Sequence, residues 1–202
     1  MALMPVAEAL GGVLAGTEPL PAQPTPLADA HGRVLAADLA ALRTQPPADV
    51  SAMDGYAVRA ADVTKVPVKL KMVGEVAAGH PFEGTVGAGE AARIFTGGVL
   101  PPGTDAIVIQ EQTQREGDAV TVTRSAAKGK HVRVAGLDFA DRAVLLRKGQ
   151  RLSDRDLALA AAMNHPTVPV HRAAKVAVLA TGDELVMPGC NAGVGEIVYS
   201  NG

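Results

Sequence analysis

The chain has 202 residues, enough to bury the core of one large domain or of two or three small ones. Apolar residues make up 48% but aromatic residues only 2%, with no tryptophan, so few side chains could stack on nucleic-acid bases. The net charge of −2 offers no electrostatic footprint for nucleic acid, and the single cysteine, Cys190, excludes an internal disulfide and a cysteine zinc cage.

The amino-terminal residues lack the basic segment and the continuous apolar run of a signal peptide. The longest apolar stretches elsewhere are short and interrupted by charge or glycine, so none is expected to cross a membrane. We therefore expect a cytoplasmic protein with neither a nucleic acid nor a membrane as its partner.

The first third of the chain predicts little regular structure. Residues 5–15 predict a short helix with Pro5 at its start. A proline-rich connector follows, and residues 26–41 predict a second short helix that breaks at Gly32 and continues as a strand over residues 33–36. The loop from Ser51 to Tyr56 then bends at an Asp-Gly pair.

From Tyr56 to Arg124 the pattern changes to short apolar runs separated by glycine- or proline-bearing turns. This spacing predicts a small antiparallel sheet or barrel. Four strands are expected within it: residues 66–73, 91–95, 106–112 and 119–124.

The last quarter predicts a helix and two strands. Ser153 is a candidate N-cap with Asp156 as its partner in a capping box, and the helix should run to about Asn164. Residues 167–171 predict a short strand. The apolar run 175–180 predicts a strand buried on both faces of a parallel α/β sheet, and because one strand cannot bury itself, we expect that domain to continue past Gly202.

Three turns carry candidate chemistry. Asp54 lies in the first, Thr96-Gly97-Gly98 ends a predicted strand, and Asp183 with Glu184 follows the apolar run. Carboxylates with a hydroxyl and free amides suit Mg²⁺ shared with a phosphate group, and a Gly-Gly pair can direct N–H groups at an anion. Taken alone, each of these turns is explained better by ordinary turn chemistry than by function.

The order of these segments resembles the molybdopterin molybdenumtransferase (MoeA) family, whose relatives include the E domains of gephyrin and plant Cnx1. The resemblance covers residues 5–201 and rests on four motifs: Ser51-Ala-Met-Asp-Gly-Tyr-Ala57, Arg93-Ile-Phe-Thr-Gly97 with the following Pro101-Pro-Gly-Thr-Asp-Ala-Ile-Val108, Arg133-x-x-Gly-x-Asp138, and Thr181-Gly-Asp-Glu-Leu185.

The resemblance implies a transferase of molybdenum cofactor biosynthesis that inserts molybdate into adenylylated molybdopterin, with Mg²⁺ present, and releases AMP. It implies a homodimer whose active site lies between the subunits. It also implies supply by an upstream molybdopterin adenylyltransferase and delivery to downstream molybdoenzymes. Family members continue well past the point that corresponds to Gly202, so the chain by itself is expected to be inactive.

The resemblance implies an α+β, multi-domain fold. By analogy, residues 41–141 form a β-rich antiparallel domain that is inserted in a small α/β linking domain made of residues 22–40 and 142–166. Residues 1–21 form an N-terminal helix that packs with the pterin-binding domain, and residues 167–202 begin that three-layer α/β domain.

The resemblance implies catalytic roles for Asp54, Thr96 and Glu184, of which Asp54 and Glu184 would bind Mg²⁺. It implies substrate binding by a further set of residues: Ser51, Met53, Gly97, Arg133, Asp138 and Asp183. The chain departs from the family at Val50, where an asparagine is usual, and at Leu137, where a glutamate is usual.

Two readings from other classes stay open at this point. The chain could be a non-catalytic scaffold that binds a partner protein, as gephyrin-like proteins do. It could also be an oxyanion-binding module that uses Thr96, Gly97 and Gly98. The presence of Asp54, Thr96 and Glu184 together favours the enzyme, because a scaffold does not need this combination.

Overall fold

The computed structural model describes residues 4–200 and divides into two compact units. The larger unit spans Pro24–Val170, and the smaller one combines the residues up to Gln23 with those from His171 onward. Each unit is described by itself. No helix within residues 4–200 has the length and apolar character needed to cross a membrane.

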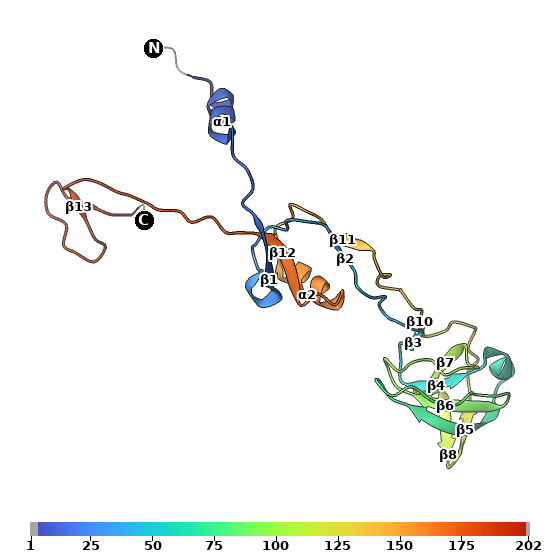
Figure 1. The fold of residues 1–202 in the computed structure, drawn as a ribbon. Helices are drawn as coiled ribbons and strands as arrows, with labels where there is room; N and C mark the ends of the chain where they lie inside the picture. The colour runs from blue at the N-terminus through green and yellow to red at the C-terminus, as the bar shows by residue number, and fades with distance from the viewer. Residues whose placement is uncertain (1–3, 201–202) are drawn as a thin grey trace. The chain divides into compact units, whose positions relative to one another are not determined.

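The larger unit is built around a six-stranded mixed sheet, drawn in green and yellow in Figure 1. In spatial order its strands are β7 (Ala106–Ile109), β4 (Gly55–Val58), β6 (Glu90–Ile94), β5 (Val68–Val76), β9 (Ala119–Val122) and β8 (Thr113–Glu116). All neighbours are antiparallel except β5 and β6. The predicted sheet is therefore mixed rather than wholly antiparallel, because the long connection between these two strands lets the chain return in the same direction.

Both faces of the sheet are covered near its centre. Tyr56 and Val58 belong to one buried cluster, while Ala57, which points to the opposite face, belongs to another. Every residue of β4 is buried for this reason. Two 3₁₀ turns accompany the sheet, η2 (Ala60–Val63) and η3 (Gln110–Gln112).

A third buried cluster draws on two stretches that are distant in the sequence. Ala30 to Ala41 supply one side, and Phe139 to Val170 supply the other. Two strand pairs and one helix frame it together with η1 (Leu27–Asp29): β2 (Leu39–Ala40) paired with β11 (Val144–Leu146), β1 (Ala22–Pro26) paired with β12 (Thr167–His171), and α2 (Asp154–Ala162). The β-rich segment is thus inserted between two halves of a smaller α/β layer, and the predicted α+β class is confirmed.

Local chemistry explains α2. The Ser153 side chain accepts a hydrogen bond from the Asp156 amide, and the Asp156 carboxylate accepts one from the Ser153 amide at 2.8 Å, which completes the predicted capping box. Leu152 and Leu157 both pack into the third cluster. The helix ends at Ala162 with Met163 as its C-cap, slightly before the predicted end at Asn164, where the chain turns with a positive φ of 75°.

The helix predicted over residues 26–41 is wrong. The range contains the 3₁₀ turn η1 and the strand β2 but no α-helix, because Gly32 turns the chain with φ 72° and the following amides bond to distant segments. The Leu35 amide donates to the Gln150 carbonyl at 2.9 Å, and the Ala36 amide donates to the Pro169 carbonyl at 2.9 Å. Tertiary hydrogen bonds therefore replace the helical ones.

The smaller unit contains the predicted first helix, α1 (Val6–Leu14), and the two-stranded parallel sheet β13 (Leu185–Val186) with β14 (Ile197–Val198). The buried strand predicted over residues 175–180 does not form: the segment has no regular structure, and Leu179 is 87% exposed. No strand among residues 4–200 pairs with it, so its backbone groups have no ladder to join.

Division of the chain into the four predicted domain ranges stays a prediction. Two of those ranges, 1–21 and 167–202, also include residues 1–3 and 201–202, which lie outside the described part of the chain.

Candidate functional site

The first two predicted motifs meet in the larger unit at Asp54 and Thr96. We call these two residues and the residues that contact them the acidic turn. Asp54 ends the loop that enters β4, and Thr96 follows the end of β6. The Thr96 amide and the Thr96 hydroxyl both donate hydrogen bonds to Oδ1 of Asp54, at 2.8 and 2.9 Å. Because β4 and β6 are neighbours, the sheet brings together two residues that are 42 positions apart.

These two hydrogen bonds lower the pKa of the Asp54 carboxyl below its ordinary value, and the nearby positive charge of Arg93 adds to the effect. The carboxyl is therefore ionised at neutral pH. Both hydrogen bonds from Thr96 reach Oδ1, so Oδ2 is the oxygen that Asp54 can offer to a ligand.

The Thr96-Gly97-Gly98 turn does not form the predicted anion cradle. The Thr96 amide donates to Asp54, the Gly97 amide donates to the Ser51 carbonyl at 2.9 Å, and the Gly98 amide donates to the Phe95 carbonyl at 2.9 Å. All three N–H groups are engaged within the chain. The hypothesis of a free-standing oxyanion-binding module requires free N–H donors in this turn. These three amides do not provide them, because an amide already bonded to a carbonyl or carboxylate has no hydrogen left for an anion.

Ser51 is a structural residue of the same loop. Its side chain is 1% exposed, and its hydroxyl donates to the Met53 carbonyl at 2.5 Å and accepts from the Met53 amide at 3.2 Å. These bonds close the turn that presents Asp54. Met53 itself is 41% exposed and free to contact a ligand.

The third motif forms a loop closed by its own ion pair. Arg133 lies in β10 (Val132–Arg133), which pairs with β3 (Val50–Ser51). One guanidinium nitrogen of Arg133 donates to both carboxylate oxygens of Asp138, at 3.0 and 3.1 Å. The pair is about half exposed, so it holds the loop in place without being removed from solvent.

Val50, where the family usually has asparagine, is buried. It lies opposite Arg133 in the β3–β10 pair and makes an isolated bridge to Val99. An apolar side chain suits this position because the side chain is buried.

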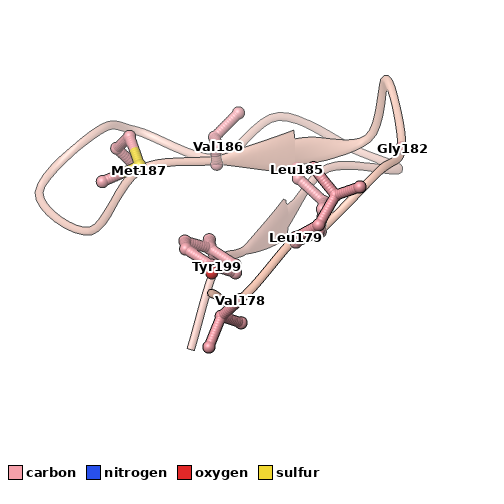
Figure 2. A pocket seen from close by; sticks show the side chains of 8 residues that line it. Val178, Leu179, Gly182, Leu185, Val186, Met187 and Tyr199 are labelled. Carbon is pink, nitrogen blue, oxygen red and sulfur yellow. The ribbon is translucent and has the colours of Figure 1, made fainter. Parts of the chain in front are cut away.

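The fourth motif lies in the smaller unit. Asp183 and Glu184 are exposed, and the Glu184 carbonyl accepts a hydrogen bond from the Ile197 amide at 2.7 Å. A cavity of about 390 Å³ adjoins this turn, and Figure 2 shows its lining, formed by Val178, Leu179, Ala180, Gly182, Leu185, Val186, Met187 and Tyr199. The lining side chains are apolar apart from Tyr199 and include no carboxylate, so the cavity offers no carboxylate ligand for Mg²⁺.

A Mg²⁺ ion fits the acidic turn only as a partly hydrated ion. Within residues 4–200 no group of three or more histidine, cysteine, aspartate or glutamate side chains could hold a metal ion. Mg²⁺ is, however, commonly bound through one or two carboxylates, with waters and substrate phosphates completing its octahedron. Oδ2 of Asp54 could supply one such ligand. Glu184 belongs to the other unit, so its partnership with Asp54 stays a prediction.

Two residues of the acidic turn were missed from the sequence: Arg93 and Gln110. Arg93 belongs to the second motif, and a charged residue among the apolar residues that end β6 is a usable signal that its side chain has a specific partner. The Gln110 amide donates to the Asp54 carbonyl at 3.1 Å. Nothing in the pattern around Gln110 distinguishes it from an ordinary strand end.

Comparison with known proteins identifies the family. Residues 4–164 match the family model described as MoeA N-terminal region (domain I and II). The molybdopterin molybdenumtransferase of Nostoc sp. (strain PCC 7120) is 40% identical over 176 residues, which cover 85% of this chain and 40% of that protein. Molybdopterin molybdenumtransferase 2 of Mycobacterium tuberculosis (strain H37Rv) is 39% identical over 180 residues, which cover 87% of this chain and 44% of that protein.

A solved structure shows the same fold. The crystal structure of the molybdopterin biosynthesis MoeA protein from Pyrococcus horikoshii OT3 matches with a TM-score of 0.89 at 36% identity, and covers 99% of this chain and 55% of that one. The chain spans less than half the length of the two relatives named above. With most of its length matched by the family model, the chain belongs to the MoeA family and carries its N-terminal region.

Proposed function

We propose that this chain supplies part of the active site of a molybdopterin molybdenumtransferase, which inserts molybdate into adenylylated molybdopterin and releases AMP. The observation that carries the proposal is the pair formed by Asp54 and Thr96: an ionised carboxylate with Oδ1 anchored by two hydrogen bonds and Oδ2 outside both of them. Family membership supports the same reaction, since the relatives are named for it.

The substrates explain why this turn would need a cation. Molybdate and the adenylylated phosphate are both anions, which a carboxylate repels unless a positive ion lies between them. Mg²⁺ would supply that charge and would bind phosphate oxygens when the substrate is present. In this proposal Oδ2 of Asp54 would hold the ion, and Glu184 would supply a second protein ligand.

Thr96 acts through Asp54 in this proposal. Its hydroxyl hydrogen and its amide hydrogen both go to Oδ1 of Asp54, which fixes the carboxylate plane and keeps the group ionised. Gly97 and Ser51 hold the backbone of the two loops together at 2.9 Å. Met53, Arg133, Asp138 and Asp183 are proposed to contact the substrate.

The wider setting follows from the family. We propose a cytoplasmic homodimer with an active site shared between subunits, supplied by an upstream molybdopterin adenylyltransferase and serving downstream molybdoenzymes. The four domain ranges predicted from the sequence belong to the same proposal. A scaffold or partner-binding protein, by contrast, would leave the paired Asp54 and Thr96 without a use.

Replacement of Asp54 in the full-length protein tests the proposal. Asp54→Asn keeps an oxygen that can accept from Thr96 but removes the negative charge. We expect AMP release from adenylylated molybdopterin to fall by about a hundredfold or more, because an electrostatic contact to the reacting groups is lost. The affinity of the protein for Mn²⁺, used as a spectroscopic probe of the Mg²⁺ site, should fall by about tenfold or more.

Asp38→Asn is the matched control. Asp38 is also an exposed carboxyl whose pKa is lowered by hydrogen bonds, from the Lys148 amide and the Arg147 guanidinium, but it lies outside the acidic turn. Its replacement should leave AMP release unchanged. An Asp54→Asn protein that releases AMP as fast as the Asp38→Asn protein would reject the proposed role of Asp54.

A further inference from the structure

The side chain of Arg93 is held at four points. Its guanidinium carbon lies 5.2 Å from the centre of the Tyr56 ring and 4.8 Å from the centre of the Phe95 ring. One terminal nitrogen donates to the Gly55 carbonyl at 3.2 Å, and the other donates to the Gln110 side-chain oxygen at 2.7 Å. Two aromatic contacts and two directed hydrogen bonds define the position of a planar guanidinium in a way that a lysine ammonium cannot reproduce.

Three of these four contacts lie beside Asp54, or at or beside a residue that donates a hydrogen bond to it. Gly55 is the residue after Asp54, and Phe95 is the residue before Thr96, the donor to Oδ1. Gln110 donates its own amide hydrogen to the Asp54 carbonyl at 3.1 Å. The guanidinium therefore bridges the three chain segments that carry Asp54 or bond to it: the start of β4, the end of β6 and the residue after β7.

The position of Arg93 is set by the sheet and not by a loop. Tyr56 lies directly opposite Arg93 in the antiparallel pair of β4 and β6. Facing residues in such a pair have side chains on the same side of the sheet, so the contact between guanidinium and ring follows from the strand register. A loop movement could not remove it without breaking the ladder.

We infer that Arg93 is a positioning residue of the acidic turn. Its guanidinium fixes the segment that carries Asp54 against Thr96, and so orients Oδ2 of Asp54 toward the proposed Mg²⁺ ion. The inference rests on the proposed function, because it concerns the same site. Arg93 does not need to touch the substrate. Its effect on the reaction passes through Asp54.

The competing explanation is that Arg93 only stabilises the sheet. A purely stabilising residue would reduce activity by the same factor whether or not Asp54 is present. A positioning residue has nothing to position once the carboxylate has been removed. A double-mutant cycle separates the two cases.

The experiment measures kcat for AMP release with four full-length proteins: wild type, Arg93→Met, Asp54→Asn and the double variant. We expect Arg93→Met to reduce kcat by on the order of tenfold to a hundredfold, because a misplaced reacting group costs rate steeply. In the Asp54→Asn background the same substitution should change kcat by less than about twofold. Equal losses in both backgrounds would overturn the inference while leaving the role of Asp54 intact.

If the proposed function itself is wrong, the double-mutant cycle gives a different result from the one that overturns the role of Arg93. If Asp54→Asn alone leaves AMP release unchanged, the acidic turn is not part of the site, whatever Arg93 does. The cycle therefore tells the two failures apart. Thermal unfolding of each variant is followed in parallel, and Arg115→Met serves as the control, because Arg115 lies in β8 of the same sheet with one hydrogen bond to the Gly117 carbonyl.

Two further variants keep the inference testable if Arg93→Met does not fold. Arg93→Lys retains the positive charge but loses the planar, two-pronged donor geometry of the guanidinium. Its kcat should therefore lie within about threefold of the kcat expected for Arg93→Met. A wild-type kcat in this variant would overturn the inference. Gln110→Leu removes an exposed anchor of the guanidinium and should reduce kcat by about threefold or more, again only when Asp54 is present.

Discussion

Gly55 is the position where a single methyl group should test the packing around Asp54. It lies in β4, where it pairs with Ile94 of β6 and with Ile109 of β7. A Cβ atom added to Gly55 would lie 2.1 Å from the Val108 carbonyl oxygen and 2.9 Å from the Ile109 Cα. These are backbone atoms, so no change of side-chain rotamer can relieve the overlap.

The expected cost of Gly55→Ala follows from this geometry. Overpacking of a buried site costs about 1–3 kcal/mol when side chains can adjust. Here the obstructing atoms belong to a paired strand that cannot move without loss of ladder hydrogen bonds, so we expect about 3 kcal/mol. For a unit of 147 residues (24 to 170), that free energy corresponds to a decrease in Tm of roughly 6–12 °C.

Scanning calorimetry of the full-length protein measures this change. Gly11→Ala is the control: Gly11 lies in the exposed helix α1, and an added Cβ there has no atom within 4 Å. The same chemical change should be neutral or stabilise by up to about 1 kcal/mol at that position, because alanine favours the helix. A Gly55→Ala protein that melts within 2 °C of wild type, about the effect of a single small surface change, would refute the close approach of β4 and β7.

Two further predictions concern stability. The Thr25 hydroxyl is buried and has no hydrogen-bond partner in the described structure. Thr25→Val should therefore raise the free energy of unfolding by about 1 kcal/mol. A lower Tm for this variant would show that the hydroxyl makes a hydrogen bond in the folded protein. The pKa of Asp156 is lowered by hydrogen bonds from the Ser153 side chain and amide, so its ionised form stabilises the fold above the unfolded-state pKa of about 3.9. Asp156→Asn should melt roughly 2–4 °C below wild type at pH 7, and this difference should disappear as the pH falls below the folded-state pKa; a difference that is constant with pH would contradict the assignment.

Local signals in the sequence were sufficient for several elements. Helix α2 was predicted with its N-cap because Ser153, Asp156 and the apolar spacing act within one turn. Strands β5, β6, β7 and β9 were predicted from short apolar runs between glycines. The strand β8 was missed, because the sequence Thr-Gln-Arg-Glu is polar throughout and is held only by its pairing with β9.

Two other segments show where local signals failed. Residues 26–41 have apolar spacing typical of a helix, yet their amides bond to residues 150 and 169. Residues 175–180 have the composition of a buried strand, yet they form none among the described residues, where no neighbouring strand is available to pair with them. In both cases the outcome depends on partners that are distant in the sequence.

The sequence by itself determined which chemical groups are present: a carboxylate at a tight turn, a hydroxyl after a strand, and motifs specific enough to identify the family. Only the tertiary structure decided how they are used. Because β4 lies beside β6, Thr96 gives both of its hydrogens to Asp54 instead of to an anion, and Arg93 is brought between two rings beside the same carboxylate. Strand pairing is set by contacts across dozens of residues, and a local pattern cannot encode it.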